Sequence, residues 1–435
     1  MKLRKPSIET AILMVIYGLV FLYFIFQETI FSPDSYGYLL AMPQRNPGYV
    51  VFSKFFEFLF PQNYARVIVG AQLVLGLVAV HVFMKRMSGL LHLNHVLKGV
   101  VLTVLLFPFF PPLLIANNIC SEGLAYPLYL LFLATGFEFL YNEKKYTLLS
   151  ISVLYILLTL TRGQFVVTSV IFAMVYFLKY QSSILNKKHL SRWLVILLVP
   201  LIAGFADKTY HKLKDGLYIS TPYAFVNMSG AAFYVSNEND VDFIETNEYK
   251  TLFSTCYKQL SDKKLLMSSK KREGYDAYYQ HFHNHVPQIC NQTVHDISRG
   301  YYYAKFLETH TDERAASVFS LWQSELACKS IFFTLVNRNF KQWSLLYCSN
   351  IVHGFKSVVL LIFVIFVFLF SCYGVLSKKH IYYEILFVCS ALTLSNAMIV
   401  SLASHSIMRY LFYNYVLIFF MVLILFKLLS NAKRS

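Results

Sequence analysis

The sequence predicts an all-α, polytopic membrane protein with about ten transmembrane helices. Of the 435 residues, 57% are hydrophobic and 14% are charged, whereas soluble proteins carry roughly 25% charged residues. Apolar runs of the length that crosses a bilayer, roughly 20 residues, recur along the chain. Aromatic residues reach 17%, as expected for spans bounded by aromatic belts. These observations divide the chain into an N-terminal membrane module (1–206), a polar segment (207–349) and a C-terminal membrane module (350–435).

Seven spans are expected in the N-terminal module. The first follows a basic head (1–5) and has no small-residue cleavage site, so it is expected to remain a membrane helix. Pro33 and Pro43 break the first external loop (28–66), in which the short, partly charged segment 49–60 is expected to lie on the membrane surface. The third span contains prolines, which neighbouring helices can accommodate. The seven expected spans are 10–27, 67–84, 99–116, 123–140, 146–161, 163–178 and 193–206.

Polar sequence begins at Asp207 and contains no span-length apolar run before 349. We expect this segment to form an external domain of mixed secondary structure. Among its cysteines, Cys256, Cys290 and Cys328 are expected to be free buried thiols, with a disulfide as the alternative. The C-terminal module supplies three further spans, at 351–376, 385–402 and 411–426.

Basic residues indicate one orientation of the chain in the membrane. If both termini are cytoplasmic, the loop cations gather on the cytoplasmic side, as they do in membrane proteins. Because the loops account for the net charge of +16, no nucleic-acid partner is predicted. The same orientation places loop 28–66, Glu122, Arg162, the polar segment and Arg409 on the opposite face. The cytoplasmic cations are Lys85, Arg86, Lys98, Lys144, Lys145, those within 179–192, Lys378, Lys379, Lys433 and Arg434.

Short motifs stand at four places along the chain, namely the first external loop and the ends of three predicted spans. The first external loop contains Ser32-Pro33-Asp34-Ser35-Tyr36 and then Arg45-Asn46-Pro47-Gly48-Tyr49. Ser121-Glu122-Gly123-Leu124 opens the fourth span, Leu160-Thr161-Arg162-Gly163 ends the fifth, and Arg409-Tyr410 precedes the last. In this order the motifs resemble those of the GT-C superfamily of membrane glycosyltransferases, with the closer likeness to its bacterial ArnT-like and protein-mannosyltransferase-like members. The likeness covers the membrane part of the chain.

The resemblance implies a GT-C-like helical bundle that transfers a sugar from a polyprenyl-phosphate donor to a glycan, lipid or protein acceptor. Asp34 is then the general base, which takes the proton of the acceptor hydroxyl. Glu122 is the second acidic residue, and it either orients the acceptor or holds a divalent metal. Ser35 stands where many members have a second acid, so no metal ligand set and no cofactor are assigned.

The resemblance also implies cationic residues that bind the donor phosphate. Arginine can hold a phosphate through two parallel hydrogen bonds, and Arg45, Arg162 and Arg409 stand at the matching positions. Tyr36 and Tyr410 lie next to these motifs and are assigned to the same substrate site.

Each candidate also has a structural interpretation. Asp34 follows Ser-Pro and is a candidate helix-capping residue, and Glu122 is favoured at a helix N-terminus by the helix dipole. Arg162 and Arg409 stand at span ends, where an arginine can extend its charge to the membrane surface, and Arg45 has interfacial positioning as its alternative.

Histidines provide one further candidate site. His281, His283 and His285 alternate with other residues, so they would share a face on a strand but not on a helix. No acidic residue with ligand spacing accompanies them, and metal binding is not predicted. His405 stands near Arg409 and is a packing residue or a member of the phosphate site.

Two other functions stay open. A transporter or lipid flippase would carry ionisable residues near the bilayer midplane and often internal repeats. A polysaccharide polymerase or ligase also joins lipid-linked glycans by means of arginines in external loops. The compact loops favour a bacterial inner membrane, with the active site on the periplasmic or outer face.

Overall fold

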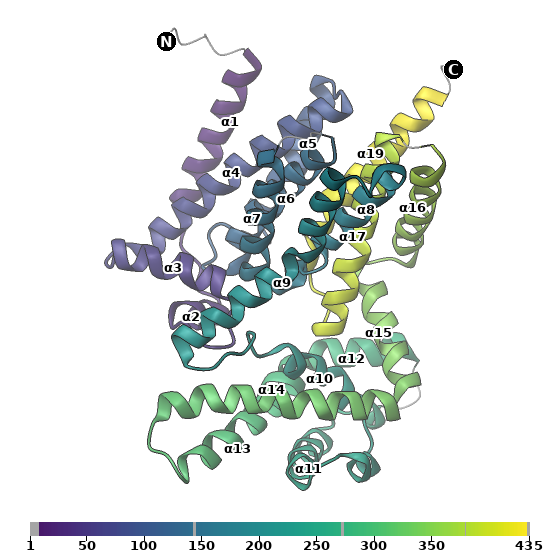
Figure 1. The fold of residues 1–435 in the computed structure, drawn as a ribbon. Coiled ribbons are helices and arrows are strands. Elements are labelled where there is room, and N and C mark those ends of the chain that lie inside the picture. Colours follow the sequence, from purple (N-terminus) through teal and green to yellow (C-terminus); the bar gives the residue numbers. More distant parts are fainter. Residues whose placement is uncertain (1–7, 142–144, 271–273, 379, 433–435) are drawn as a thin grey trace. The chain divides into compact units, whose positions relative to one another are not determined.

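The computed structural model describes residues 8–141, 145–270, 274–378 and 380–432 (Figure 1). Several cations of the orientation argument lie outside the described residues. Within the described residues every regular element is a helix, and no strand occurs. The all-α class is therefore confirmed, whereas the described part of 207–349 contains helices in place of the mixed structure expected from sequence. The cations outside the described residues are those of 1–5, Lys144, Lys379, Lys433 and Arg434.

Eight of the described helices are long and apolar enough to cross a membrane. They support an integral membrane protein, but the expected number of ten is not confirmed. Two expected spans correspond to shorter apolar helices, His95–Phe109 and Tyr146–Thr161. The first ends early because prolines at 108, 111 and 112 cannot donate the hydrogen bonds that continue a helix. The eight are Ile8–Ile25, Tyr64–Leu91, Ser121–Tyr141, Gly163–Ser183, Lys187–Asp215, Val358–Ser377, Ile381–Ala403 and Tyr413–Ser430.

The chain separates into two compact units. Unit 1 comprises Met1–Ala203, Cys372–Cys389 and Tyr415–Ser435, and unit 2 comprises Gly204–Ser371 and Ser390–Asn414. Four helices have residues in both units: α9 (Lys187–Asp215), α16 (Val358–Ser377), α17 (Ile381–Ala403) and α19 (Tyr413–Ala432).

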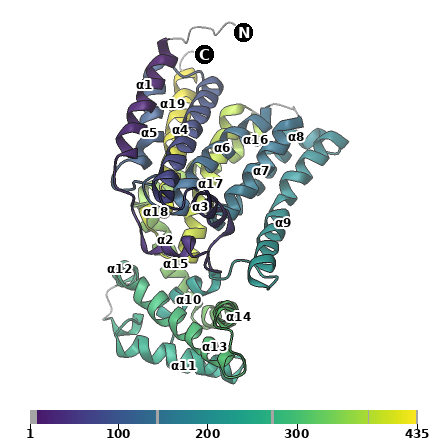
Figure 2. The same cartoon turned by 90° about the vertical axis from the view of Figure 1, so that its left-hand side faces the viewer.

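Unit 1 is organised around α6 (Ser121–Tyr141), which is largely buried and packs against α4 (Tyr64–Leu91) and α7 (Lys145–Thr161). Glycines allow close packing, since a Cβ on Gly76 would lie 2.5 Å from the ring of Phe109. In a bilayer, helices associate through such close van der Waals contact. The remaining helices of this unit are α1 (Ile8–Ile25), α2 (Pro33–Leu39), α3 (Pro47–Leu59), α5 (His95–Leu106) and α8 (Thr168–Tyr180). Figure 2 shows α4, α6 and α7 from a second side.

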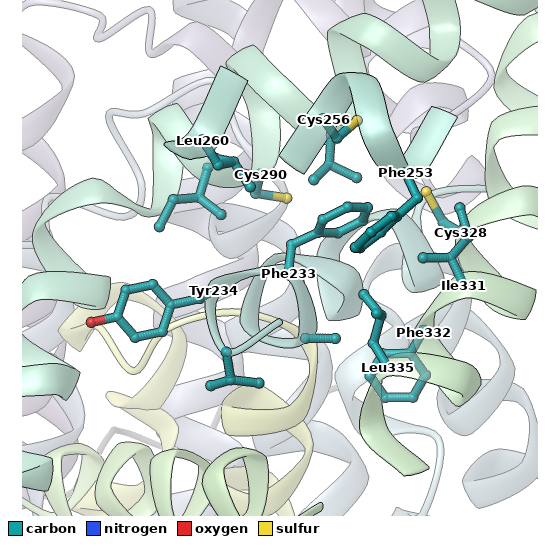
Figure 3. Close-up of a cluster of buried hydrophobic side chains, with 14 of the residues drawn as sticks. Phe233, Tyr234, Phe253, Cys256, Leu260, Cys290, Cys328, Ile331, Phe332 and Leu335 are labelled. Atoms are coloured by element: carbon teal, nitrogen blue, oxygen red, sulfur yellow. The ribbon is translucent and has the colours of Figure 1, made fainter. Parts of the chain in front are cut away.

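Unit 2 packs short helices around a core of aromatic rings and thiols (Figure 3). Cys256, Cys290 and Cys328 are buried in this core and free, as expected, and the alternative disulfide is not formed. Burial raises the pKa of the Cys256 and Cys290 thiols to about 12, so both are unreactive at neutral pH. The helices are α10 (Ala224–Tyr234), α11 (Asn247–Asp262), α12 (Tyr275–Val286), α13 (Asp296–Leu307), α14 (Glu313–Arg338), α15 (Phe340–Gly354) and α18 (Met408–Leu411).

Two expected boundaries differ from the structure. Polar sequence begins at Asp207, but α9 continues as a helix to Asp215. The expected span 351–376 is divided, because α15 ends at Gly354 and Lys356 adopts a positive φ of 60° before α16 begins. Hydropathy does not register either feature, since a helix can continue into polar sequence and a single backbone turn can interrupt apolar sequence.

Candidate functional site

In unit 1 the first external loop is held against the segment that precedes α6. Ile30 donates a backbone hydrogen bond to the Asn117 carbonyl at 2.8 Å and accepts one from Ile119 at 3.0 Å. The Asn117 side chain donates to the Phe24 carbonyl in α1 at 2.9 Å. These bonds bring the beginning of α2 to the beginning of α6.

A glutamine of α4 joins these segments to α3. The Tyr49 hydroxyl donates to Gln72 Oε1 at 2.8 Å, and Gln72 Nε2 donates to the carbonyls of Ala116 at 2.7 Å and Asn118 at 3.2 Å. Gly123 leaves room for the amide, because a Cβ there would lie 2.4 Å from it. A buried amide with its partners in place fixes the relative positions of the groups it joins.

The first ion pair of the site links α2 to the loop that follows it. A helix begins at this sequence as expected, but Ser32 is the N-cap of α2 and Asp34 lies in its first turn, so the aspartate is not the capping residue. Its carboxylate also accepts from Arg45 Nη2 at 2.9 Å, with side-chain exposures of 31% for Asp34 and 24% for Arg45. A Cβ on Gly37 would lie 2.4 Å from Arg45 Nε, so the arginine packs directly on the backbone of α2.

The second ion pair is more deeply buried. Arg162 Nη1 lies 2.9 Å from Glu122 Oε1, and the two side chains are only 12% and 3% exposed. Arg162 also donates to Ser121 Oγ at 3.1 Å and to Gln164 Oε1 at 2.7 Å. It stands where α7 ends and the chain becomes extended. The side chain is therefore paired inside the protein, as a charge between apolar helices requires.

Tyr38 lies between the two ion pairs. Its ring is 6% exposed, and the Arg45 guanidinium lies 5.0 Å from the ring centroid. Its hydroxyl lies near Ser121. Burial, reinforced by the neighbouring Cys120 and Glu122, raises the pKa of Tyr38 well above its usual value, so the phenol is neutral and can donate a hydrogen bond.

The same environment affects Arg45. Burial alone lowers the pKa of this guanidinium, but Asp34 and Tyr38 more than offset it, and the net shift is upward. Arg45 is therefore a permanent cation beside a neutral phenol.

The Pro-Gly turn places the Arg45 loop against the end of α7. A Cβ on Gly48 would lie 2.6 Å from Thr161 Oγ1 and 2.7 Å from the Thr161 backbone nitrogen. Because Thr161 directly precedes Arg162, this contact sets the two arginine-bearing segments side by side. Only glycine allows so close an approach of the two backbones.

The structure brings together four predicted residues, Asp34, Arg45, Glu122 and Arg162. Tyr36 is 59% exposed and stacks on Phe31 at 6.3 Å, so it lies outside the buried cluster. The sequence led to no site role for three buried members, of which Gln72 carried the clearest signal as a lone amide within an apolar span. These residues are Tyr38, Tyr49 and Gln72.

Arg409 and Tyr410 belong to unit 2, where they lie in the short helix α18. The loop before α18 is tied to α15, since Asn350 Nδ2 donates to the Ser401 and Ser404 carbonyls at 2.9 and 2.8 Å. Ser406 donates its backbone N–H to Asn350 Oδ1 at 2.9 Å. These bonds fix the point from which Arg409 projects.

The histidine tract lies on α12 and is divided between two faces, as expected for a helix. His281 and His285 have ring centroids 4.6 Å apart, while His283 lies 4.9 Å from His353 and 4.7 Å from His405. Among the described residues, no group of three or more His, Cys, Asp or Glu side chains is placed to hold a metal ion.

An open apolar groove of about 800 Å³ lies in unit 1 between α1, α3 and α4. Arg66 and Asn63 are its polar residues, and both stand at the beginning of α4. The groove therefore combines a long apolar wall with a cation and an amide at one end. Its apolar lining is Phe21, Ile25, Phe56, Val67, Gly70, Ala71, Val74 and Leu75.

The chain matches no protein-family model, no curated protein and no solved structure.

Proposed function

We propose that this chain is an integral-membrane glycosyltransferase that moves a sugar from a polyprenyl-phosphate donor to a glycan, lipid or protein acceptor. One observation carries the proposal. Two carboxylate–guanidinium pairs, Asp34 with Arg45 and Glu122 with Arg162, come from separate segments of unit 1 and meet around Tyr38. Glycosyl transfer from a phosphate needs these groups, namely a carboxylate base and a fixed cation.

The proposed reaction breaks the bond between the sugar C1 and the donor phosphate oxygen. The acceptor oxygen forms the new bond to C1, and its proton passes to the Asp34 carboxylate. The phosphate leaves with the electron pair of the broken bond, and Arg45 stabilises its growing charge.

The Asp34–Arg45 pair is proposed to open when the donor binds. Arg45 Nε is buried and has no hydrogen-bond partner among the described residues, an arrangement that is unfavourable for a guanidinium N–H. A donor phosphate draws Arg45 away from the carboxylate and satisfies more of its N–H groups. This exchange frees Asp34 to act as a base only when the donor is present.

Arg162 has a different proposed role. It is held by Glu122, Ser121 and Gln164, so it acts as a positioning residue that orients the Glu122 carboxylate toward the acceptor.

The apolar groove is proposed to receive the hydrocarbon chain of the donor. A polyprenyl phosphate needs an apolar path that opens to the bilayer and a cation near the phosphate, and the groove offers both through its lining and Arg66. The active site is proposed to face the periplasm of a bacterial inner membrane, as the distribution of loop cations indicates.

The test is sugar transfer by purified protein in nanodiscs, with labelled hexose or pentose on polyprenyl phosphate as donor. Wild type is expected to release polyprenyl phosphate and to label an acceptor, and Asp34→Asn to lose at least about a thousandfold, or about 4 kcal/mol of transition-state stabilisation. Glu57→Gln is the matched control, because its carboxylate pairs with Lys54 at 2.8 Å on the exposed surface of α3.

Two results oppose the proposal. Near-normal transfer by Asp34→Asn removes this residue as the base. Absence of both donor binding and turnover, together with movement of labelled lipid across reconstituted vesicles, indicates a lipid flippase.

A further inference from the structure

A polar hollow of about 630 Å³ lies between α13 and α14 in unit 2. Both views show these helices side by side, joined by a short loop (Figures 1 and 2). Its volume falls in the range of ligand pockets, roughly 300–1,000 Å³. The α13 wall consists of Asp296, Arg299, Gly300 and Tyr303.

One face of α13 forms this wall. Its four lining residues are spaced at i, i+3, i+4 and i+7, so they line up along one side of the helix. Opposite them stand Glu313, Arg314 and Ser317 from the first two turns of α14. Asp312 fixes the beginning of α14, because its Oδ1 accepts from the backbone of residues 314 and 315 at 2.9 and 3.0 Å.

The hollow exists because the centre of the α13 face has no side chain. A Cβ on Gly300 would meet no atom within 4 Å. Glycine is a weaker helix former than alanine, so its place in the middle of α13 costs helix stability and leaves open space. Arg299 Nη2 donates to Ser317 Oγ at 3.2 Å and joins the two walls beside this space.

The lining is charged but electrically balanced. Asp296 and Glu313 accept hydrogen bonds, Arg299 and Arg314 donate them, and Tyr303 adds an aromatic ring with a hydroxyl. A phosphate or other anion would meet both carboxylates, and an apolar ligand would remove four charges from water without replacing their hydrogen bonds. A polyol meets neither obstacle, because each hydroxyl donates to a carboxylate and accepts from a guanidinium.

We propose that this hollow is a binding site for neutral saccharides. The hydroxyls of a sugar unit pair with the acids and arginines, and an apolar face of the ring lies on Tyr303. The role of the hollow as the docking site of a glycan acceptor rests on the transferase function proposed above. Saccharide binding in the hollow does not depend on that function.

The test is calorimetric titration of the full chain in nanodiscs with cellobiose, lactose, mannobiose and chitobiose. Gly300→Phe fills the hollow and is expected to weaken binding of the preferred disaccharide by at least about tenfold. The matched control is Ser254→Phe, which adds the same ring to an exposed position of α11 outside the lining and is expected to bind as wild type does. Arg299→Gln provides a second weakened variant if Gly300→Phe does not fold.

Three results would overturn the inference: no binding of any of the four disaccharides, binding that survives both Gly300→Phe and Arg299→Gln, and displacement of the sugar by inorganic phosphate at equal concentration. The transferase proposal fails separately, because Asp34→Asn tests unit 1 and leaves the titration of unit 2 unchanged. Binding without transfer by wild type would retain the saccharide site and remove its acceptor role.

Discussion

The buried Arg162–Glu122 pair predicts a large loss of stability when only one partner is removed. Arg162→Gln removes the cation that lies 2.9 Å from the Glu122 carboxylate, which is 3% exposed. Breaking a buried pair in this way costs about 3–5 kcal/mol. The Asp34–Arg45 pair is several times more accessible, so water can replace the missing partner, and Arg45→Gln should cost roughly 1 kcal/mol.

The assay is reversible unfolding of the purified protein in mixed detergent and SDS micelles, followed by far-ultraviolet circular dichroism. Glu122→Gln and the double variant Glu122→Gln/Arg162→Gln complete a double-mutant cycle. We expect the double variant to be more stable than Arg162→Gln alone, because it no longer contains an uncompensated buried carboxylate.

Equal losses for Arg162→Gln and Arg45→Gln, or a loss below about 1 kcal/mol for Arg162→Gln, would refute this reasoning. Either result would mean that water reaches Glu122 and that the pair is not a buried one.

Three further predictions follow from single positions. Gly37→Ala should reduce transfer at least about tenfold, because its Cβ displaces the arginine of the first ion pair; Gly99→Ala, whose Cβ meets no atom within 4 Å, is the control in the same transfer assay. A maleimide at pH 7 should label the exposed Cys348 before denaturation and Cys256 only afterwards, since burial raises the pKa of Cys256 to about 12; mass spectrometry of peptides checks this. Burial, aided by neighbouring histidines, lowers the pKa of His405 from 6.5 to about 4, so the unfolded state binds its proton first as the pH falls. Stability should then decrease from about pH 6.5 to about pH 4, and His405→Gln should flatten this part of the pH profile in unfolding experiments.

Hydropathy predicted the long helices because burial in lipid requires an uninterrupted apolar stretch. Such a stretch can be recognised from the residue types alone. It overestimated the span 99–116, where a helix ending near Phe109 depends on local backbone geometry at several prolines. It also missed the turn at Lys356, since a single residue with positive φ hardly changes the hydropathy averaged over a sequence window.

The charged members of the candidate site could be found from sequence because an arginine or glutamate beside an apolar span needs a partner. Which acid pairs with which arginine could not be found. The pairing depends on the contacts of Gly48 with Thr161 and of Gly123 with Gln72, which join residues far apart in sequence. Tyr38 and Tyr49 were missed for a related reason, since the chain contains 32 tyrosines and only the fold distinguishes these two.

Gln72 connects the geometry of the site to the thickness of the surrounding membrane. The apolar stretch of α4, residues 67–84, is about 27 Å long at about 1.5 Å per residue, close to the roughly 30 Å of the hydrocarbon core. In a thinner bilayer this stretch exceeds the core and adapts by tilting, so the tilt of α4 changes with the bilayer. Because the Gln72 amide holds Tyr49 and the carbonyls of Ala116 and Asn118, any such tilt shifts the segments that carry the two ion pairs. The chain length of the surrounding lipids therefore affects the relative positions of the two ion pairs.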